Sequence, residues 1–447
     1  GNIIYKQDDV LKEVQDYYEC LYSARDVTDV NLDTIVHEAT KLSQCESDSL
    51  EGPLSYTEAC CALKNMSNNK SPGSDGFTVE FFKFFFINIG VFLVRSVNEG
   101  FLNKNLSVTQ RQGIIICIPK DDKPKQYLKN WRPISLLNTA YKIVSASIAN
   151  RLKNVLPKII HDDQKGFMKG RYIGENIRKI YDVLRYTEAE NIPGLLLSVD
   201  IEKAFDSVSW AFMQKALEFF NFGPCLIQWI ATLYHSPISC VSVNGQYSKW
   251  FSVCRGVRQG DPSSSYLYLL CAEIMSILIR QNVKIKGIQM NELEVLLSQF
   301  ADDTNVCLDG SEESFNECMR VLRQFSDMSG LKINFEKTNV VWIGRMKNSN
   351  IRYLRDENFC WNPGTFRILG ILFCIDTDRM IELNYDGKLM TIRRDLHKWN
   401  KRQLTPLGKI TILKTIIFSK LTYLFLNLPD PPANVMKEIE NMMFKFL

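Results

Sequence analysis

The stretch FADDT at Phe300–Thr304 places two adjacent carboxylates, Asp302 and Asp303, between two apolar runs, LEVLLSQF before and TNVCL after. Two apolar runs around a short polar break predict a strand, a tight turn and a second strand, with the acids at the turn. Adjacent carboxylates are costly in apolar surroundings unless a cation neutralises them, and Mg²⁺ and Mn²⁺ prefer such hard oxygen ligands. The stretch therefore predicts a strand hairpin that carries a divalent metal site.

A third carboxylate follows another apolar run in LLLSVDIEKAFDSV, which spans Leu195–Val208. Asp200 comes directly after the run, at the predicted end of a buried strand, so the strand fixes its position. Phosphoryl transfer by two metal ions needs acids from separate chain segments, which hold the ions about 4 Å apart. Asp200, Asp302 and Asp303 together supply such a set.

The order of motifs along the chain resembles that of the non-LTR (LINE-type) retrotransposon reverse transcriptases. Asp200, RQGDP and FADD are similar to the palm of a reverse transcriptase, and the surrounding segments resemble the non-LTR group in particular. Those segments are NNKSPGSDGFTVEFFK (Asn68–Lys83), IPK (Ile118–Lys120), NWRPISLLNTAYKI (Asn130–Ile143), QKGFMKGR (Gln164–Arg171), DIEKAFDSV (Asp200–Val208), GVRQGDPSSSYLYLL (Gly256–Leu270), SGLKINFEKT (Ser329–Thr338), LGILF (Leu369–Phe373) and RQLTPLGKITILK (Arg402–Lys414). Several motifs in one fixed order are far more specific than any one of them.

The resemblance implies an α+β fold of the right-hand polymerase type, with fingers, an antiparallel palm sheet and a helical thumb. The predicted parts are a helical N-terminal extension at 1–55, fingers at 56–190, a palm with returning helices at 191–380 and a thumb at 381–447. Apolar patterns predict a strand over GIIICIP, a helix over SFNECMRVLRQFSDMSG that stops at Gly330, and a strand pair through Trp342 and Leu369–Phe373. Near the N-terminus, helical spacing predicts a packed face of Val10, Val14, Tyr17, Tyr18 and Leu21.

For the chemistry, the resemblance implies two Mg²⁺ or Mn²⁺ ions and dNTP substrates. Asp200 and Asp302 are the predicted metal ligands, the backbone carbonyl of Ile201 is a ligand that only the resemblance implies, and Asp303 is a third carboxylate nearby. A metal-bound 3′-hydroxyl is acidified by the ion, so the reaction needs no histidine base. Lys337 is a candidate proton donor to the departing pyrophosphate, with an ordinary surface lysine as the alternative.

Three neighbours of Asp200 need separate interpretation. Glu202 and Asp206 are read as solvated or structural acids, because a two-metal site needs only two or three carboxylates. Phe205 lies five residues after Asp200, where the resemblance implies a bulky aromatic that excludes a ribose 2′-hydroxyl. A core phenylalanine at a helix start is the alternative for Phe205.

Four further residues are predicted to contact the incoming nucleotide. Lys120 and Arg132 resemble fingers residues that hold the triphosphate, since arginine suits bidentate phosphate contacts and lysine acts as a point charge. Gln259 and Gly260 resemble the loop against the nucleotide and template base, where glycine permits close backbone approach. Ser-Ser-Ser at 263–265 replaces the usual Leu-Ser-Pro, and loss of that proline predicts a loosened start of the next helix.

Basic residues predict phosphate contacts in two crowded segments, Lys120–Lys142 and one near the C-terminus, and Lys70 is a further candidate. Lys70 lies in KSPGSDG, which is glycine-rich but lacks the spacing of a P-loop and is read as fingers structure near the template. Near the C-terminus, cations lie among apolar residues at helical spacing, which predicts packed helices whose cations contact phosphates. The alternative is that these cations only face solvent. These cations are Arg393, Arg394, Lys398, Lys401, Arg402, Lys409 and Lys414.

Composition sets broad limits. With 45% hydrophobic residues the chain can bury a core, and its net charge of +4 is too small to identify nucleic acid as a partner by itself. Thirteen irregularly spaced cysteines without a secretory signal predict a reduced intracellular compartment, here nucleus and cytoplasm. No apolar stretch looks long enough to cross a membrane. A start at Gly1 and an end inside a helical pattern suggest a fragment of a longer protein.

The predicted function is RNA-directed DNA polymerisation that copies a retrotransposon RNA from a DNA 3′-hydroxyl, with RNA template and DNA primer or target as partners. No endonuclease motif is visible, so target cleavage is expected outside this segment or in a partner. One alternative is a group II intron maturase, although the phrases IEKAFDSV and GLKINFEKT favour the LINE side. Another is an inactive palm that serves as an RNA-binding scaffold, against which the intact acids argue.

Overall fold

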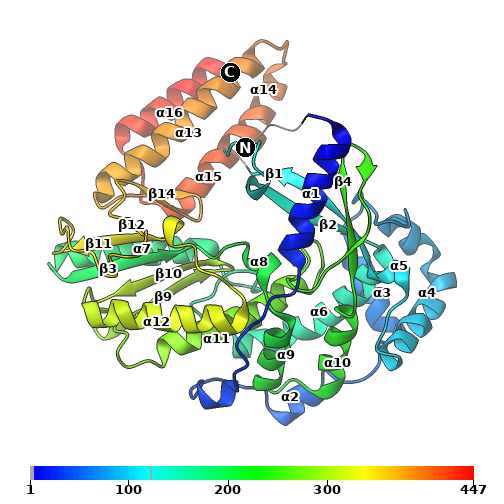
Figure 1. Cartoon of the computed structure of the whole chain (residues 1–447). Coiled ribbons are helices and arrows are strands. Elements are labelled where there is room, and N and C mark those ends of the chain that lie inside the picture. The colour runs from blue at the N-terminus through cyan, green and yellow to red at the C-terminus, as the bar shows by residue number, and fades with distance from the viewer. Residues whose placement is uncertain (1–4, 121–122) are drawn as a thin grey trace. The chain divides into compact units, whose positions relative to one another are not determined.

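The computed structural model describes residues 5–120 and 123–447, and the chain forms two compact units. The first unit comprises residues up to Asp162, Ile201–Asn282 and Met319–Ile333. The second comprises Asp163–Asp200, Val283–Cys318 and Asn334–Leu447. Both units combine helices with a five-stranded sheet (Figure 1), so the α+β class is confirmed.

The sheet of the first unit has the strand order β2-β1-β4-β5, with β6 also pairing with β4. Its strands are β1 (Gln112–Pro119), β2 (Trp131–Leu137), β4 (Ile238–Val243), β5 (Gln246–Tyr247) and β6 (Phe251–Ser252). The helices of this unit are α1 (Gln7–Tyr22), α2 (Gln44–Asp48), α3 (Tyr56–Asn65), α4 (Val79–Leu102), α5 (Val108–Arg111), α6 (Thr139–Ile159), α8 (Ala204–Ser207), α9 (Trp210–Phe219), α10 (Pro224–Leu233) and α11 (Ser264–Arg280), with 3₁₀ turns at Leu32–Thr34 and Leu128–Asn130. The apolar run GIIICIP forms β1, as predicted.

Helix α1 packs against this sheet through one aromatic face. Val14, Tyr18 and Tyr22 are buried and form a cluster with Ile115 of β1 and Val241 of β4. The predicted face is confirmed, because Val10, Tyr17 and Leu21 also pack against this cluster, and Tyr22 extends it by one helical step. The N-terminal helix is therefore an integral layer of the first unit.

The sheet of the second unit has the strand order β12-β11-β3-β10-β9. Its strands are β3 (Pro193–Val199), β9 (Leu297–Phe300), β10 (Asp303–Leu308), β11 (Asn339–Gly344) and β12 (Cys360–Trp361). Two separate hairpins are β7 (Ile288–Met290) with β8 (Leu293–Val295), and β13 (Phe366–Ile368) with β14 (Ile371–Phe373). The helices are α7 (Ile173–Ala189), α13 (Thr377–Asn400), α14 (Pro406–Ile412), α15 (Phe418–Asn427) and α16 (Ala433–Phe446), with a 3₁₀ turn at Phe335–Lys337 and a π-helical turn at Leu413–Ile417.

Helix α12 (Glu312–Ser329) begins in the second unit and ends in the first. Gly330 follows it with φ +79° and donates its N–H to the carbonyl of Ser326, which confirms the predicted stop. A residue with positive φ directly after a helix is the usual position for glycine, because a Cβ is strained there.

The predicted strand pair through Trp342 and Leu369–Phe373 is wrong as a pair. Trp342 lies in β11, which pairs with β3, whereas Ile371–Phe373 forms β14 and pairs with β13. Leu369 and Gly370 both have positive φ and form the two-residue loop of that hairpin. Because such a loop matches the twist of the strands beside it, β14 pairs with its sequence neighbour.

The compact units divide the chain at other positions than the predicted domains. Residues 163–190, predicted as fingers, group with the sheet of β3 and β10, and residues 201–282, predicted as palm, group with the sheet of β1 and β4. Contacts between residues far apart in sequence decide this grouping, so linear boundaries cannot reproduce it. The names fingers, palm and thumb remain predictions.

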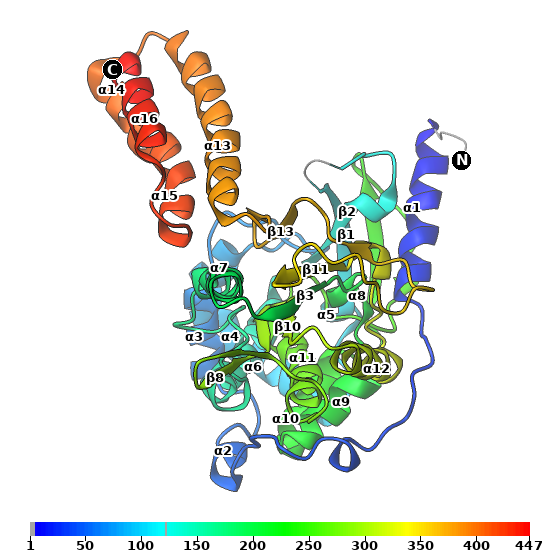
Figure 2. The same ribbon diagram turned by 90° about the vertical axis from the view of Figure 1, so that its left-hand side faces the viewer.

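Helices α13 to α16 form the C-terminal bundle of the second unit (Figures 1 and 2). Asn384, Tyr385, Leu389 and Ile392 are buried on the inner side of α13. Helix α14, the π-helical turn and α15 run on as one helix over Pro406–Asn427, which is long and apolar enough to cross a membrane by length and composition. This corrects the expectation that no such stretch exists, although core helices of soluble proteins pass the same test.

Candidate active site

The register of the second sheet brings the three predicted acids to one end of neighbouring strands. β3 and β10 are antiparallel, and their last pair is Val199 with Thr304. One step further along the ladder Asp200 lies opposite Asp303. Directly opposed residues of an antiparallel pair project from the same face, so these two carboxylates face the same side of the sheet.

The second acid segment is a tight hairpin, as predicted from FADDT. Phe300 of β9 pairs with Asp303 of β10, which leaves Ala301 and Asp302 as a two-residue loop. Ala301 has a positive φ of +55°, whereas the φ of Asp302 is not positive. Two-residue loops of this kind turn the chain sharply, and therefore Asp302 stands at the tip of the hairpin beside Asp303.

The three carboxylates interact electrostatically. Asp302 and Asp303 are both exposed, but partial desolvation of the Asp303 carboxylate and the charges of Asp302 and Asp200 raise its pKa to about 6. In the described part of the chain, no three or more His, Cys, Asp or Glu side chains form a group that could hold a metal. The predicted metal ligands are the carboxylates of Asp200 and Asp302 and the backbone carbonyl of Ile201, so they include only two such side chains. A site with mutually repelling oxygens of this kind fits a divalent cation.

The backbone around Asp200 is anchored to the turn that precedes β11. Asp200 donates its N–H to Thr338 Oγ1 at 3.3 Å and accepts from the N–H of Asn334 at 2.8 Å. Lys337 lies in the same turn, and its Nζ is 3.7 Å from Asp200 Oδ2. The predicted proton donor and the predicted metal ligand are therefore neighbours, both partly exposed.

Ile201 follows Asp200 and forms an isolated antiparallel bridge with Ile333. The two hydrogen bonds of this bridge run from the N–H of Glu202 to the carbonyl of Lys332 and from the N–H of Asn334 to the carbonyl of Asp200, each at 2.8 Å. Neither bond uses the Ile201 carbonyl. Whether that carbonyl binds a metal remains a prediction.

In the first unit, Phe205 and Gln259 have defined partners. The Phe205 ring stacks on Tyr268 with centroids 4.5 Å apart and an interplanar angle of 18°. The Gln259 amide lies 3.3 Å from both carboxylate oxygens of Asp206. The phenol of Tyr22 also donates to Asp206, at 2.8 Å.

Of the two acids read as solvated or structural, Asp206 is buried and Glu202 is exposed. Desolvation raises the pKa of Asp206 to about 6, while Tyr22, Lys203, Gln259 and Lys120 act in the opposite direction. Asp206 is thus a structural acid that ties α1 to the Gln259 loop. The sequence did not reveal Tyr22 as its partner, because the two residues are 184 positions apart.

The RQGDP segment is held tightly. Gly260 has φ +118°, and a Cβ there would lie 2.5 Å from the carbonyl oxygen of Ser135 in β2, so this position requires glycine. The predicted approach to a nucleotide and template base remains a prediction. Asp261 is buried and accepts from Tyr141, Ser145 and Ser263. Ser263 also donates its N–H to Ser145 Oγ at 3.2 Å. These hydrogen bonds hold Ser263 at the start of α11, and loosening relative to a proline at this place remains a prediction.

Lys120 and Arg132 lie on the β1–β2 hairpin. Arg132 pairs with Ile118, and Lys120 donates its backbone N–H to the carbonyl of Asn130 at 2.8 Å. Since side chains alternate along a strand, those of Lys120 and Arg132 project from the same face. Arg132 is exposed and Lys120 is half-buried, which leaves Arg132 accessible to an anion.

The predicted nucleic-acid residues are largely on the surface. Lys70, Arg394, Lys398 and Lys401 are exposed. The Arg402 guanidinium lies 5.1 Å over the Trp399 ring. Two cations are already engaged within the C-terminal bundle: Arg393 pairs with Glu438, and Lys409 donates to the carbonyl of Leu447.

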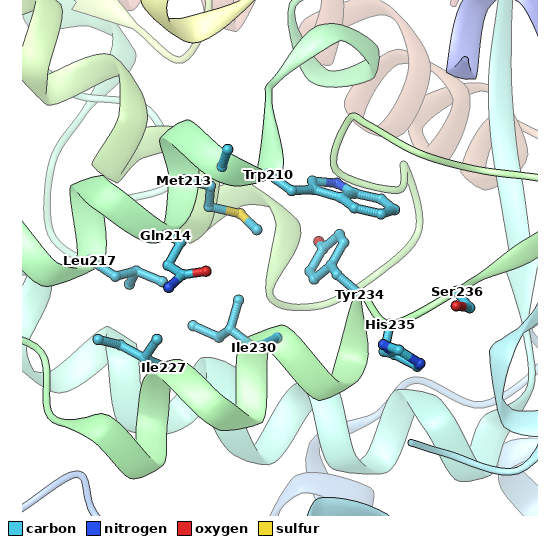
Figure 3. A pocket seen from close by; sticks show the side chains of 11 residues that line it. Trp210, Met213, Gln214, Leu217, Ile227, Ile230, Tyr234, His235 and Ser236 are labelled. Atoms are coloured by element: carbon cyan, nitrogen blue, oxygen red, sulfur yellow. The ribbon is translucent and has the colours of Figure 1, made fainter. Parts of the chain in front are cut away.

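A cavity of about 360 Å³ lies between α9 and α10 of the first unit (Figure 3). Met213, Leu217, Ile227 and Ile230 point into it, with Tyr234 at one end. None of the predicted site residues lines this cavity. Because its walls carry no carboxylate, it is not suited to a divalent metal.

The raised pKa of Asp303 predicts a pH-dependent stability. The pKa rises from 3.8 to about 6, so folding favours the protonated form. The associated stability is fully present below about pH 4 and is lost as the pH rises through about 6. Asp303→Asn should therefore raise the unfolding temperature of the metal-free protein near pH 7.5, and the gain should disappear near about pH 4.

The measurement is thermal unfolding in a chelator across this pH range. Glu202→Gln is the matched control, because it removes a nearby exposed acid and should produce no comparable pH-dependent gain. An unchanged or lower unfolding temperature for Asp303→Asn at neutral pH would contradict the repulsion between the three acids.

Comparison with known proteins identifies the class. A sequence profile of the family described as reverse transcriptase (RNA-dependent DNA polymerase) matches residues 118–372, more than half of the chain. The chain therefore belongs to the reverse transcriptase family. The match begins in the last residues of β1 and includes every predicted catalytic residue, among them the acids after β3 and in the β9–β10 turn.

The relatives narrow this class to the non-LTR retrotransposon reverse transcriptases, as predicted. The chain is 28% identical over its whole length to the 149 kDa protein of transposon TX1 from Xenopus laevis, of which it covers 34%. It is 22% identical to the Pol polyprotein of the type-1 retrotransposable element R2 from Popillia japonica, with 88% of this chain and 54% of that protein aligned. The RNA-directed DNA polymerase from mobile element jockey of Drosophila melanogaster is 27% identical over 52% of this chain and 25% of its own length. The chain thus spans between a third and about half of the first two relatives.

Proposed function

We propose that this chain copies a retrotransposon RNA into DNA by extending a DNA 3′-hydroxyl at a target site, with dNTPs as substrates. The observation that carries this proposal is the group of electrostatically coupled acids, Asp200, Asp302 and Asp303, at one end of the second sheet. The names of the relatives support the polymerase activity. The direct test is extension of a DNA primer on an RNA template by the purified chain, with Mg²⁺ or Mn²⁺ present and absent.

Asp200 and Asp302, with the Ile201 carbonyl, would hold two divalent ions, and Asp303 would supply further negative charge. Such ions, when bound, activate the 3′-hydroxyl and stabilise charge on the departing pyrophosphate. The carboxylates repel each other in the free protein, so cation binding relieves a cost that the fold imposes. Lys337, whose Nζ lies 3.7 Å from Asp200 Oδ2, would act as the proton donor to the departing pyrophosphate.

The first unit would supply the contacts to the nucleotide. Arg132 and Lys120 share a face of the β1–β2 hairpin and would bind the triphosphate. Phe205 would exclude ribonucleotides through its ring, which Tyr268 supports from one side. Gln259 and Gly260 would lie against the base pair being formed, with Asp206 orienting the Gln259 amide.

In the right-hand description, the strands β3, β9, β10 and β11 would form the palm and α13–α16 the thumb. The fingers would include the β1–β2 hairpin, with Lys70 near the template. Cleavage of the target would come from a segment outside this chain or from a partner, and the chain would be located in the nucleus and cytoplasm. A maturase or an inactive scaffold has no specific observation in its favour.

The thumb proposal leads to a prediction about salt dependence. Replacing Lys398, Lys401 and Arg402 together by Gln should weaken binding to an RNA–DNA hybrid and shorten the products. Phosphate contacts release counterions, so the slope of log affinity against log salt should become shallower by about one unit per cation removed. Sequence preference should not change, because phosphates carry no base information.

Lys420→Gln is the control, since Lys420 is paired with Asp395 in the same bundle and is not among the predicted phosphate contacts. Removing it lowers the net charge but should leave the slope nearly unchanged. Binding is measured over a salt series, and processivity on a long template. If the triple variant keeps the wild-type salt slope and product length, Lys398, Lys401 and Arg402 do not contact phosphates and only face solvent.

A further inference from the structure

The hairpin that carries Asp302 contains a strained residue. Ala301 is the first of its two loop residues and has φ +55°. In this left-handed region a Cβ is unfavourable, and glycine is the usual residue at such a loop position. Something outside the hairpin must therefore hold Ala301 in place, because its own conformational preference opposes the turn.

The side chain of Gln164 supplies this support. Its Oε1 accepts from the N–H of Ala301 at 2.8 Å, and its Nε2 donates to the carbonyl of Ala301 at 3.2 Å. The same Oε1 accepts from the N–H of Gly166 at 2.8 Å. Gln164 is only 2% exposed, so these bonds form away from competing water. Both polar backbone groups of the residue before Asp302 are thus fixed by one amide.

The backbone of the same segment runs alongside β9. The N–H of Gln299 donates to the carbonyl of Asp163 at 2.9 Å, and the N–H of Lys165 donates to the carbonyl of Gln299 at 2.8 Å. A Cβ on Gly166 would lie 3.0 Å from Ala301 Cα and closer still to Ala301 N. Position 166 consequently requires glycine if the hairpin is to lie where it does.

Residues in helix α7 and just before it bond to this segment and to β9. Arg171 donates from Nη1 to the carbonyl of Gln164 at 2.7 Å, and Asn176 donates from Nδ2 to the carbonyl of Gln299 at 2.7 Å. Lys165 forms an ion pair with Glu175. No role was predicted for the segment QKGFMKGR from the sequence. In the structure its hydrogen bonds and ion pair connect α7 to the hairpin.

We propose that Gln164 is a positioning residue for the reaction: it fixes the peptide on each side of Ala301 and thereby sets where the Asp302 carboxylate points. The inference rests on the proposed function. Gln164 itself need not touch metal or substrate. A displacement of about 1 Å in a reacting group can cost on the order of a hundredfold in rate. Loss of the Gln164 hydrogen bonds to Ala301 should therefore lower kcat.

The test compares Gln164→Met, which keeps the side-chain length but removes both polar atoms, with the wild-type chain. Single-nucleotide addition to a primer on an RNA template gives kcat and KM, and titration of Mn²⁺ followed by electron paramagnetic resonance gives the affinity for the metal alone. We expect kcat to fall about a hundredfold and Mn²⁺ affinity to weaken about tenfold, with little change in KM for primer–template.

Asn384→Leu is the matched control. Asn384 is also buried in the second unit and makes three backbone hydrogen bonds, to the N–H and carbonyl of Leu372 and to the carbonyl of Met380. Its loss should lower the unfolding temperature much as Gln164→Met does, yet leave kcat and Mn²⁺ affinity near wild type. Equal kcat and Mn²⁺ affinity in the two variants, at a temperature where both are folded, would reduce Gln164 to a structural residue.

Gly166→Ala decides the matter if Gln164→Met does not fold. It keeps the Gln164 amide but pushes a methyl group against Ala301, so kcat should again fall at least about tenfold with KM unchanged. An active Gly166→Ala with wild-type Mn²⁺ affinity would overturn the proposal. A wild-type chain that extends no primer would instead refute the proposed function, so the two failures are distinguishable.

Discussion

Replacing Asp200 or Asp302 by alanine should abolish DNA synthesis on an RNA template, with a loss of at least about a hundredfold in turnover. Asp200 directly follows β3 and Asp302 stands in the β9–β10 turn, so the proposed ligands come from separate chain segments. Removing either carboxylate would take away negative charge and one proposed oxygen ligand. The measurement is the single-nucleotide extension rate, with Mg²⁺ or Mn²⁺ varied over a wide range.

Glu202→Gln is the control for this prediction, because Glu202 is an exposed acid two residues from Asp200. It should retain activity close to wild type. A variant of Asp200 or Asp302 that keeps more than about a tenth of wild-type turnover would remove that residue from the metal site, since each ligand should matter far more. Removal of divalent ions by a chelator should stop the reaction reversibly.

Phe205→Val should allow the enzyme to incorporate ribonucleotides, because a smaller side chain no longer clashes with a 2′-hydroxyl. We expect the ratio of kcat/KM for dNTP over rNTP to fall by about a hundredfold, within the range that steric pockets achieve. The ratio is measured with matched pairs of nucleotides on one template. Overall activity should fall less than the ratio does.

The stacking of Phe205 on Tyr268 makes a second variant necessary. Tyr268→Leu removes the same ring contact from the other side while it leaves Phe205 in place. If Phe205 is a gate, Tyr268→Leu should disturb discrimination much less than Phe205→Val. If both variants lose activity and keep the wild-type ratio, Phe205 is a core residue and the gate prediction is wrong.

Local patterns predicted the elements that carry the acids. The apolar run before Asp200 forms β3, and the runs around FADD form β9 and β10, because alternating or continuous apolar residues need a sheet to bury them. The stop of α12 at Gly330 was also predicted, since one residue with positive φ terminates a helix locally. These features depend on residues close together in the sequence.

The pairing of β14 was predicted wrongly, and the hydrogen bonds at the start of α11 were not predicted. Ser145 and Asp261 hold Ser263 at the start of α11, and Ser145 is 118 residues away in the chain. The pattern around Phe373 indicated a strand but not its partner. Partners are chosen by loop geometry and by long-range packing, neither of which a single-sequence pattern contains.

Motif identity and spacing are enough to predict the acids, their order along the chain and the family. The tertiary structure was needed to place Asp200 opposite Asp303 and the Gln164 amide against Ala301, 137 residues further along the chain. It also decided that Asp206 is buried against Tyr22 and Gln259. The physical reason is that strand register and buried hydrogen bonds join residues far apart in sequence, and they are specified by the packing of the whole unit.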